Sequence, residues 1–183
     1  MTAARADVTE RLSRLAEKRL RGLTPYWAGE VMVGEDACSS GVVDYMGVRF
    51  PGNARETLAE GDVERASFVF VEVKSCIDDF VLGHGLNFQG DENWLVCERV
   101  LADELKERML VPAGIEVFVP DRSETRLVKY VDTGSERTRR RHSAAFLLTR
   151  ILMRTTSKRR IEEEGDPDCL EEILMEEGWK EEK

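Results

Sequence analysis

One aspartate and a glutamate–lysine pair are the residues of this chain best suited to chemistry. Glu72 and Lys74 end the apolar run that begins at Ser67, and their spacing of two places both side chains on one face of an extended strand. Asp44 lies in a second strand-forming segment, Val42–Phe50. If the two strands are neighbours, the carboxylates of Asp44 and Glu72 can bind one hard cation such as Mg²⁺ or Mn²⁺.

The elements that must position these residues alternate between helices and strands. A strand that is apolar on both faces up to Val71 is typical of the buried centre of a sheet, and charges at its end indicate a polar site. Periodicity and turn residues predict helices or helical turns over Val8–Leu23, Arg55–Ala59, Asp78–Leu82, Val100–Met109, Ala144–Leu152 and Cys169–Trp179, and strands over Glu30–Val33, Val42–Phe50, Ser67–Lys74, Trp94–Cys97, Ile115–Val119 and Arg126–Val131. This order predicts a mixed α/β layer arrangement.

Length and composition describe one domain with a tail. The chain has 183 residues, of which 42% are hydrophobic and 34% charged, and this suits a folded domain over residues 1–160 and an acidic tail over 161–183. No run approaches the ~20 apolar residues that span a bilayer, and the charged N-terminus lacks a signal-peptide core. We therefore expect a cytoplasmic protein without a membrane partner. Four widely spaced cysteines and two histidines predict neither a zinc site nor a disulfide framework.

Opposite charges gather near the C-terminal end. Residues 161–183 contain 11 acidic residues and two lysines, which account for the whole net charge of −9, whereas residues 137–160 contain nine basic residues and no acid. The basic segment is either a solvated helix face or a DNA-binding surface that the tail is able to screen. The residues expected to contact DNA are Arg139, Arg140, Arg141, Arg150 and Arg154, with Arg11, Arg14 and Lys18 of the first helix. Residues 23–136 carry a net charge of −12, which opposes the wrapping of DNA around them.

An aspartate on one strand, followed by Glu-x-Lys at the end of the next and preceded by a helix, resembles the PD-(D/E)XK superfamily of restriction-endonuclease-like phosphodiesterases. The matching residues are Asp44, Glu72 and Lys74. Further segments resemble a phage- and prophage-associated branch near the MmcB family of DNA-repair proteins, namely Glu72–Ser75, Asp79–Phe80, Asn87–Gly90, Asn93–Val96 and Pro112–Ile115. This resemblance covers roughly residues 40–157 and departs from the usual pattern at Leu82–Leu86, where related chains place Gly-His directly before Asn-Phe.

The resemblance implies an α/β fold of restriction-endonuclease type, with a mixed central sheet flanked by helices and a C-terminal basic helix, which the acidic tail follows. It also implies Mg²⁺-dependent hydrolysis of DNA phosphodiester bonds. Asp44, Glu72 and the backbone carbonyl of Val73 would hold the metal, which polarises a phosphoryl oxygen and lowers the pKa of a bound water. Lys74 would orient that water or stabilise the charge that develops on phosphorus. We therefore expect a DNA nuclease or DNA-repair protein with DNA as its partner. A homodimer is one of the assembly states compatible with this expectation.

These assignments have plainer alternatives. Glu-x-Lys also occurs as a surface ion pair at a strand end, and Glu30 or Asp36 is the fallback acid if the strand pairing differs. Asn87 and Gln89 either contact DNA or hold their own loop, and His84 is either a phosphate contact or an ordinary loop residue. The whole chain is alternatively a non-catalytic binding module of a phage or mobile element that retains the nuclease fold.

Overall fold

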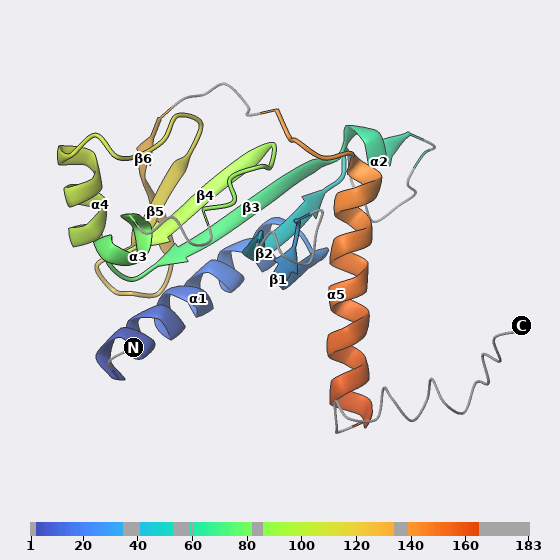
Figure 1. Ribbon diagram of the computed structural model, residues 1–183, viewed down its shortest axis with the longest axis horizontal. Helices are drawn as coiled ribbons and strands as arrows, with labels where there is room; N and C mark the ends of the chain where they lie inside the picture. Colours follow the sequence, from blue (N-terminus) through green and yellow to red (C-terminus); the bar gives the residue numbers. More distant parts are fainter. Residues whose placement is uncertain are drawn as a thin grey trace, which may run out of the picture.

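The computed structural model describes residues 3–34, 41–52, 59, 61–81, 86–133 and 139–164, which form a sheet flanked by helices (Figure 1). The six strands lie side by side in chain order, as β1 (Trp27–Met32), β2 (Val42–Arg49), β3 (Ser67–Lys74), β4 (Glu92–Cys97), β5 (Glu116–Pro120) and β6 (Leu127–Asp132). β1, β2 and β3 pair antiparallel, β3, β4 and β5 pair parallel, and β6 returns antiparallel to β5. The expected α/β class with a mixed sheet is therefore confirmed.

The helices are α1 (Ala3–Leu23), α2 (Asp62–Arg65), α3 (Ile77–Val81), α4 (Arg99–Glu107) and α5 (Ala144–Glu164). α1 begins earlier than its apolar periodicity predicts, and α5 continues past residue 161, where we placed the start of the acidic tail, to Glu164. The expected acidic helix over Cys169–Trp179, and nearly all of the one over Arg55–Ala59, lie outside the described residues.

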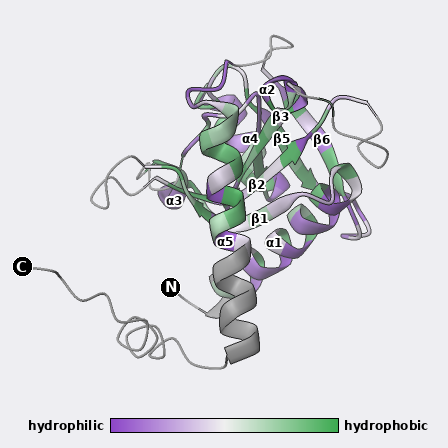
Figure 2. Ribbon diagram, turned by 90° about the vertical axis from the view of Figure 1, so that its right-hand side faces the viewer, coloured by the Kyte–Doolittle hydropathy of each residue, from purple (hydrophilic) through white to green (hydrophobic). Residues whose placement is uncertain are grey.

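β3 lies at the centre of the sheet because its sequence is apolar on both faces. Every residue of β3 after Ser67 is buried. Phe68 and Phe70 belong to the core cluster that α5 covers, whereas Val69 and Val71 belong to the cluster that α1 covers. Burial of one such side chain contributes roughly 1.5–3 kcal/mol, so two covered faces fix both the place and the register of the strand. Figure 2 shows hydrophobic colouring in the strands and in the coloured turns of α5, while α1 carries long hydrophilic stretches.

α1 packs one apolar stripe against the sheet. Leu12, Leu15 and Leu20 are buried at helical spacing, and Arg14 on the other side is exposed. The helix ends before Thr24, whose hydroxyl donates a hydrogen bond to the carbonyl of Val48 in β2 at 2.6 Å. None of the helices among the described residues combines the length and the apolar character that a bilayer crossing requires.

The opposite face of the sheet is shared by two helices. α5 covers the β1–β2 side, whereas α4 covers the β4–β5 side through Leu101 and Leu105, which pack with Leu95 and Val117. Leu95 lies beside Glu72 in the parallel register of β3 and β4. Glu72 therefore lies on the face between these two apolar clusters.

Candidate active site

The charged pair of β3 lies inside the protein. Glu72 is 0% and Lys74 5% exposed, so the alternative of a solvated ion pair at a strand end does not hold. Both side chains point to the face that carries Phe70, because alternate residues of a strand share a face. A buried carboxylate and ammonium are costly to remove from water, so their surroundings decide what they can do.

Asp44 reaches β3 where the β2–β3 ladder ends. The last antiparallel pair on this side is Tyr45 opposite Val71. Beyond it, Asp44 Oδ2 accepts a hydrogen bond from the backbone N–H of Val73 at 2.7 Å, so a side chain takes the place of a backbone acceptor. The strands of Asp44 and Glu72 are therefore neighbours, as the sequence required.

The fold opposes ionisation of both carboxyl groups. Burial is the largest cause that raises the pKa of Asp44. Burial, followed by the nearby charge of Asp44, raises the pKa of Glu72 to about 9, against the lowering effects of an Asn87 backbone hydrogen bond and the charge of Lys74. Glu72 therefore holds a proton at neutral pH unless a further positive charge comes close to it.

The two oxygens of Glu72 differ in their partners. Oε1 accepts a hydrogen bond from the backbone N–H of Asn87 at 3.0 Å, whereas Oε2 is buried and accepts none from a described N–H or O–H group. A hydrogen bond between the carboxyl groups of Asp44 and Glu72 contributes to raising the pKa of Glu72 and lowers that of Asp44. The Asn87 side chain donates to the carbonyl of Val42 at 2.8 Å and so ties its loop to β2. Asn87 thus holds its loop, which is one of the two roles considered for it. It also holds the carboxyl group of Glu72, which the sequence did not predict.

Two carboxylates with an unsatisfied buried oxygen suit a hard divalent cation. No group of three or more His, Cys, Asp or Glu side chains that could hold a metal occurs in the part of the chain that is described. Mg²⁺ commonly takes one or two carboxylates and fills its octahedron with water and substrate oxygens, so the pair of Asp44 and Glu72 fits this ion better than zinc. Val73, expected to contribute its carbonyl, uses its N–H to hold Asp44.

Other acids near the pair have separate roles. Asp79 lies in the first turn of α3, and its charge contributes to raising the pKa of Asp44. Its carboxylate is therefore close enough to the site to influence it electrostatically. The fallback acid Glu30 forms an ion pair with Arg154, and Asp36 lies outside the described residues, as does His84. Asp44 is thus the acid that the fold brings to Glu72.

The loop before β4 is fixed to the segment before α5. The side-chain oxygen of Gln89 lies 2.9 Å from Nε2 of His142, and its backbone carbonyl accepts from the N–H of Arg141 at 3.2 Å. Two roles were considered for Gln89, and these two contacts support the one in which it holds its loop. Gln89 and Asn87 together hold the loop between the acids of the sheet and α5.

Three of the arginines expected to contact DNA bind within the protein. Arg140 donates to the carbonyls of Ala66 and Glu64, each at 2.8 Å, and pairs with Asp91 at 3.2 Å. Arg150 donates to the carbonyl of Gly34 at 3.4 Å.

Arg154 completes this group through Glu30 and the carbonyl of Gly29, the latter at 3.2 Å. Arg139 and Arg141 are exposed. The first helix shows the same pattern, because Arg11 pairs with Glu98 and Glu124, Arg14 with Glu10, and Lys18 with the carbonyl of Thr125. Much of the basic sequence therefore stabilises the fold.

The comparisons with known proteins bear on the fold. No family model matches the chain, and no curated protein matches it. Among solved structures, the SPO1766 protein of unknown function from Silicibacter pomeroyi is similar, with 17% sequence identity and a TM-score of 0.55. The match covers 88% of this chain and 93% of that chain. At this identity, the likeness shows that the two proteins share their fold.

Proposed function

We propose that the protein is a metal-dependent phosphodiesterase that hydrolyses DNA, built on a restriction-endonuclease-like fold of the PD-(D/E)XK type. The observation that carries the proposal is the burial of Glu72 and Lys74 beside the half-buried Asp44, around the end of the central strand. The effect of each carboxyl group on the pKa of the other supports their grouping into one site.

The proton on Glu72 and the charge of Lys74 are together enough to balance the two acids, so the site has a neutral state without a ligand. A divalent cation would supply the further positive charge that allows Glu72 to ionise, and it would bind Oε2, which accepts no hydrogen bond from a described N–H or O–H group. Both acids would therefore be ionised together only with a cation bound.

The residues of the chain have distinct tasks in this proposal. When bound, Mg²⁺ or Mn²⁺ polarises a phosphoryl oxygen and lowers the pKa of a coordinated water. The N–H of Val73 keeps Asp44 oriented, and the N–H of Asn87 does the same for Glu72. Lys74 carries three N–H donors on the same strand face as Glu72, so it orients the attacking water or stabilises the charge that develops on the phosphate.

DNA would be held by the basic residues that the fold does not engage for itself. Arg139 and Arg141 are exposed beside the loop that Gln89 anchors, and we propose them as phosphate contacts. Arg140, Arg150 and Arg154 are reassigned to holding α5 and the segment before it on the sheet.

Cleavage of linear, nicked, flap and single-stranded DNA with Mn²⁺ tests the proposal. We expect the wild type to cut at least one of these substrates and Lys74→Met to lose about 10²–10³-fold in rate. Glu64→Gln removes an exposed acid of α2 and is the matched control, so it should cleave at the wild-type rate. A wild type that binds DNA and cuts none of the substrates would instead support the non-catalytic binding module.

A further inference from the structure

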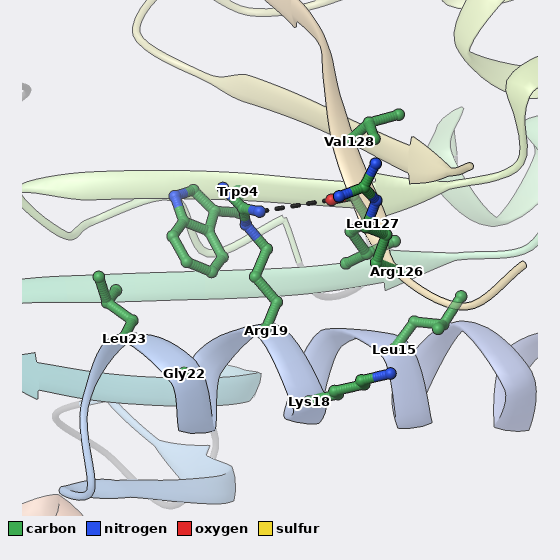
Figure 3. A pocket seen from close by; sticks show the side chains of 9 residues that line it. All are labelled: Leu15, Lys18, Arg19, Gly22, Leu23, Trp94, Arg126, Leu127 and Val128. Carbon is green, nitrogen blue, oxygen red and sulfur yellow. Dashed lines mark hydrogen bonds between the residues drawn. The ribbon is translucent and has the colours of Figure 1, made fainter.

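A pocket of about 600 Å³ opens on the α1 face of the sheet (Figure 3). Trp94 and Leu127 on its strand side belong to the cluster that α1 covers, and Leu15 of α1 lines it from the helix side. Glu72 and Lys74 point to the opposite face. The pocket is therefore separate from the proposed metal site and has a volume typical of sites for small molecules, which are about 300–1,000 Å³.

Arg19 is the central charge of this pocket. Its guanidinium lies 5.2 Å from the ring centre of Trp94 and 4.1 Å from that of Phe118, and one of its N–H groups donates to the carbonyl of Leu127 at a long 3.4 Å. Nε of Arg19 is buried without a hydrogen-bond partner in the described part of the chain. Desolvation lowers the pKa of Arg19. This guanidinium is thus poorly compensated.

The nearest acid does not neutralise Arg19. Glu116 raises the pKa of Arg19 through its charge, but its carboxylate forms an ion pair with Lys129 at 2.6 Å. Across the described residues, no carboxylate lies within ion-pairing distance of Arg19. A partly buried cation with an incomplete set of acceptors favours a negatively charged partner.

The other residues that line the pocket also favour a negatively charged ligand. Trp94 is 3% exposed, and its Nε1, which can only donate, has no partner among the residues described. Lys18 and Arg126 add two further cations at the rim, where Lys18 also donates to the carbonyl of Thr125 and Arg126 pairs with Asp121 at 3.2 Å, and no acid is among the lining residues. Leu15, Leu127 and the indole of Trp94 supply apolar walls. The pocket offers donors and positive charge beside an apolar surface.

We propose that this pocket binds a small organic anion, in which a carboxylate or phosphate group is attached to an apolar body. The anionic group would pair with Arg19 and accept hydrogen bonds at the rim from Lys18 or Arg126, and the apolar body would lie against Leu15 and Leu127. This inference does not depend on the proposed nuclease activity, because no residue of the metal site lines the pocket.

NMR titration of the ¹⁵N-labelled full chain tests the proposal directly. The signals to follow are the indole N–H of Trp94, assigned with Trp94→Phe, and the Nε–H of Arg19. Phenyl phosphate and benzoate are the anionic probes, benzyl alcohol tests the apolar body alone, and inorganic phosphate tests the charge alone. We expect saturable shifts with at least one anionic probe at up to about 10 mM, and at least about ten-fold weaker binding of both simple probes.

Substitutions identify the anchor. Arg19→Gln should weaken binding of the anionic probe by about ten-fold or more, whereas Arg14→Gln on the exposed side of α1 should leave it unchanged. If Arg19→Gln does not fold, Lys18→Gln and Arg126→Gln at the rim should each weaken binding by about three-fold. Asp44→Asn should bind the probe as the wild type does, which separates this outcome from failure of the metal site.

Several results would overturn the proposal. They are the absence of saturable shifts with both anionic probes, equal binding of benzyl alcohol, and equal affinity in the wild type and in Arg19→Gln. If Arg19→Gln does not fold, unchanged affinity for the anionic probe in both Lys18→Gln and Arg126→Gln would also overturn the proposal.

Discussion

The acids of the central sheet and the arginines around α5 differ in how the fold satisfies their charges. The charge of one lysine acts on both Asp44 and Glu72, and Glu72 has a buried oxygen that accepts no hydrogen bond from a described N–H or O–H group. Arg140, in contrast, donates to two backbone carbonyls and pairs with Asp91. A charge that is engaged within the fold has a structural explanation, whereas a buried acid whose ionisation is opposed indicates a ligand.

Loss of the acids should have the largest effect, and it should fall on activity. We expect Asp44→Asn and Glu72→Gln each to lower the rate of Mn²⁺-dependent DNA cleavage by about 10³-fold, equivalent to about 4 kcal/mol in the barrier. The free energy of unfolding in the presence of a chelator should not fall, because each amide removes a buried acid. Single-turnover cleavage and urea unfolding measure the two quantities. If the two variants lost stability but cleaved DNA at the wild-type rate, the acids would have a structural role, which would contradict their contrast with the arginines around α5.

Gly90 tests the loop that joins the two regions. A Cβ atom at Gly90 would lie 2.5 Å from a ring carbon of Phe70 and 2.7 Å from the carbonyl oxygen of Phe68, so Gly90→Ala forces the loop away from β3. We expect a loss of about 2–3 kcal/mol in the free energy of unfolding. The backbone contact of Asn87 with Glu72 should loosen as well, which should reduce cleavage in the variant that still folds.

Gly22→Ala is the matched control for this substitution. A Cβ atom there meets nothing within 4 Å, and alanine favours the helix. Urea unfolding should show a gain of about 0.5–1 kcal/mol. Equal stability of the two alanine variants would show that the loop is not packed as described.

Arg140 and Arg141 separate structure from binding at adjacent positions. Arg140→Gln should lower the free energy of unfolding by about 2 kcal/mol, because the partly buried Asp91 loses its ion-pair partner and two carbonyls lose their donor. Arg141→Gln should change stability by less than about 0.5 kcal/mol but weaken DNA binding at matched salt. Urea unfolding and fluorescence anisotropy with labelled DNA measure these effects. If Arg141→Gln lowered the stability and Arg140→Gln weakened only DNA binding, the division of the basic residues into structural and DNA-binding groups would be wrong.

The last prediction concerns the pH dependence of stability. Glu72 has a pKa of about 9 in the folded protein against an ordinary value of 4.5. Between these values the folded state holds a proton that the unfolded chain has lost, so the free energy of unfolding should fall as the pH rises, by about 1 kcal/mol per pH unit. Glu72→Gln should remove this slope in urea unfolding with a chelator present. Parallel slopes in the two proteins would mean that Glu72 ionises freely.

The sequence predicted the strands better than their edges. The apolar lead-in to Glu72 indicated a central strand, and β3 occupies the centre of the sheet. The first strand was expected to begin at Glu30, but β1 begins at Trp27, because Trp27 and Ala28 pair with Gly47 and Met46 of β2. The residue at which a strand begins or ends depends on pairing with segments that are distant in the sequence, and local periodicity does not reveal this pairing.

The candidate site was predictable where residue type matters. The spacing of Glu72 and Lys74 gave their common face, and their burial follows from the apolar strand that carries them. The support from Asn87 was not predictable, because it donates to Glu72 through a backbone N–H that almost every residue possesses. The internal partners of Arg140 were equally hidden, since two of them are backbone carbonyls.

Binding of Mn²⁺ measured by calorimetry at pH 7 in buffers of different ionisation enthalpy tests the central claim most directly. If the acids form a cation site, the wild type should bind Mn²⁺ and release about one proton, because Glu72 must lose its proton to become a ligand. Asp44→Asn and Glu72→Gln should abolish both the binding and the proton release. Mn²⁺ binding that is absent in the wild type, or equally tight in both variants, would contradict the account.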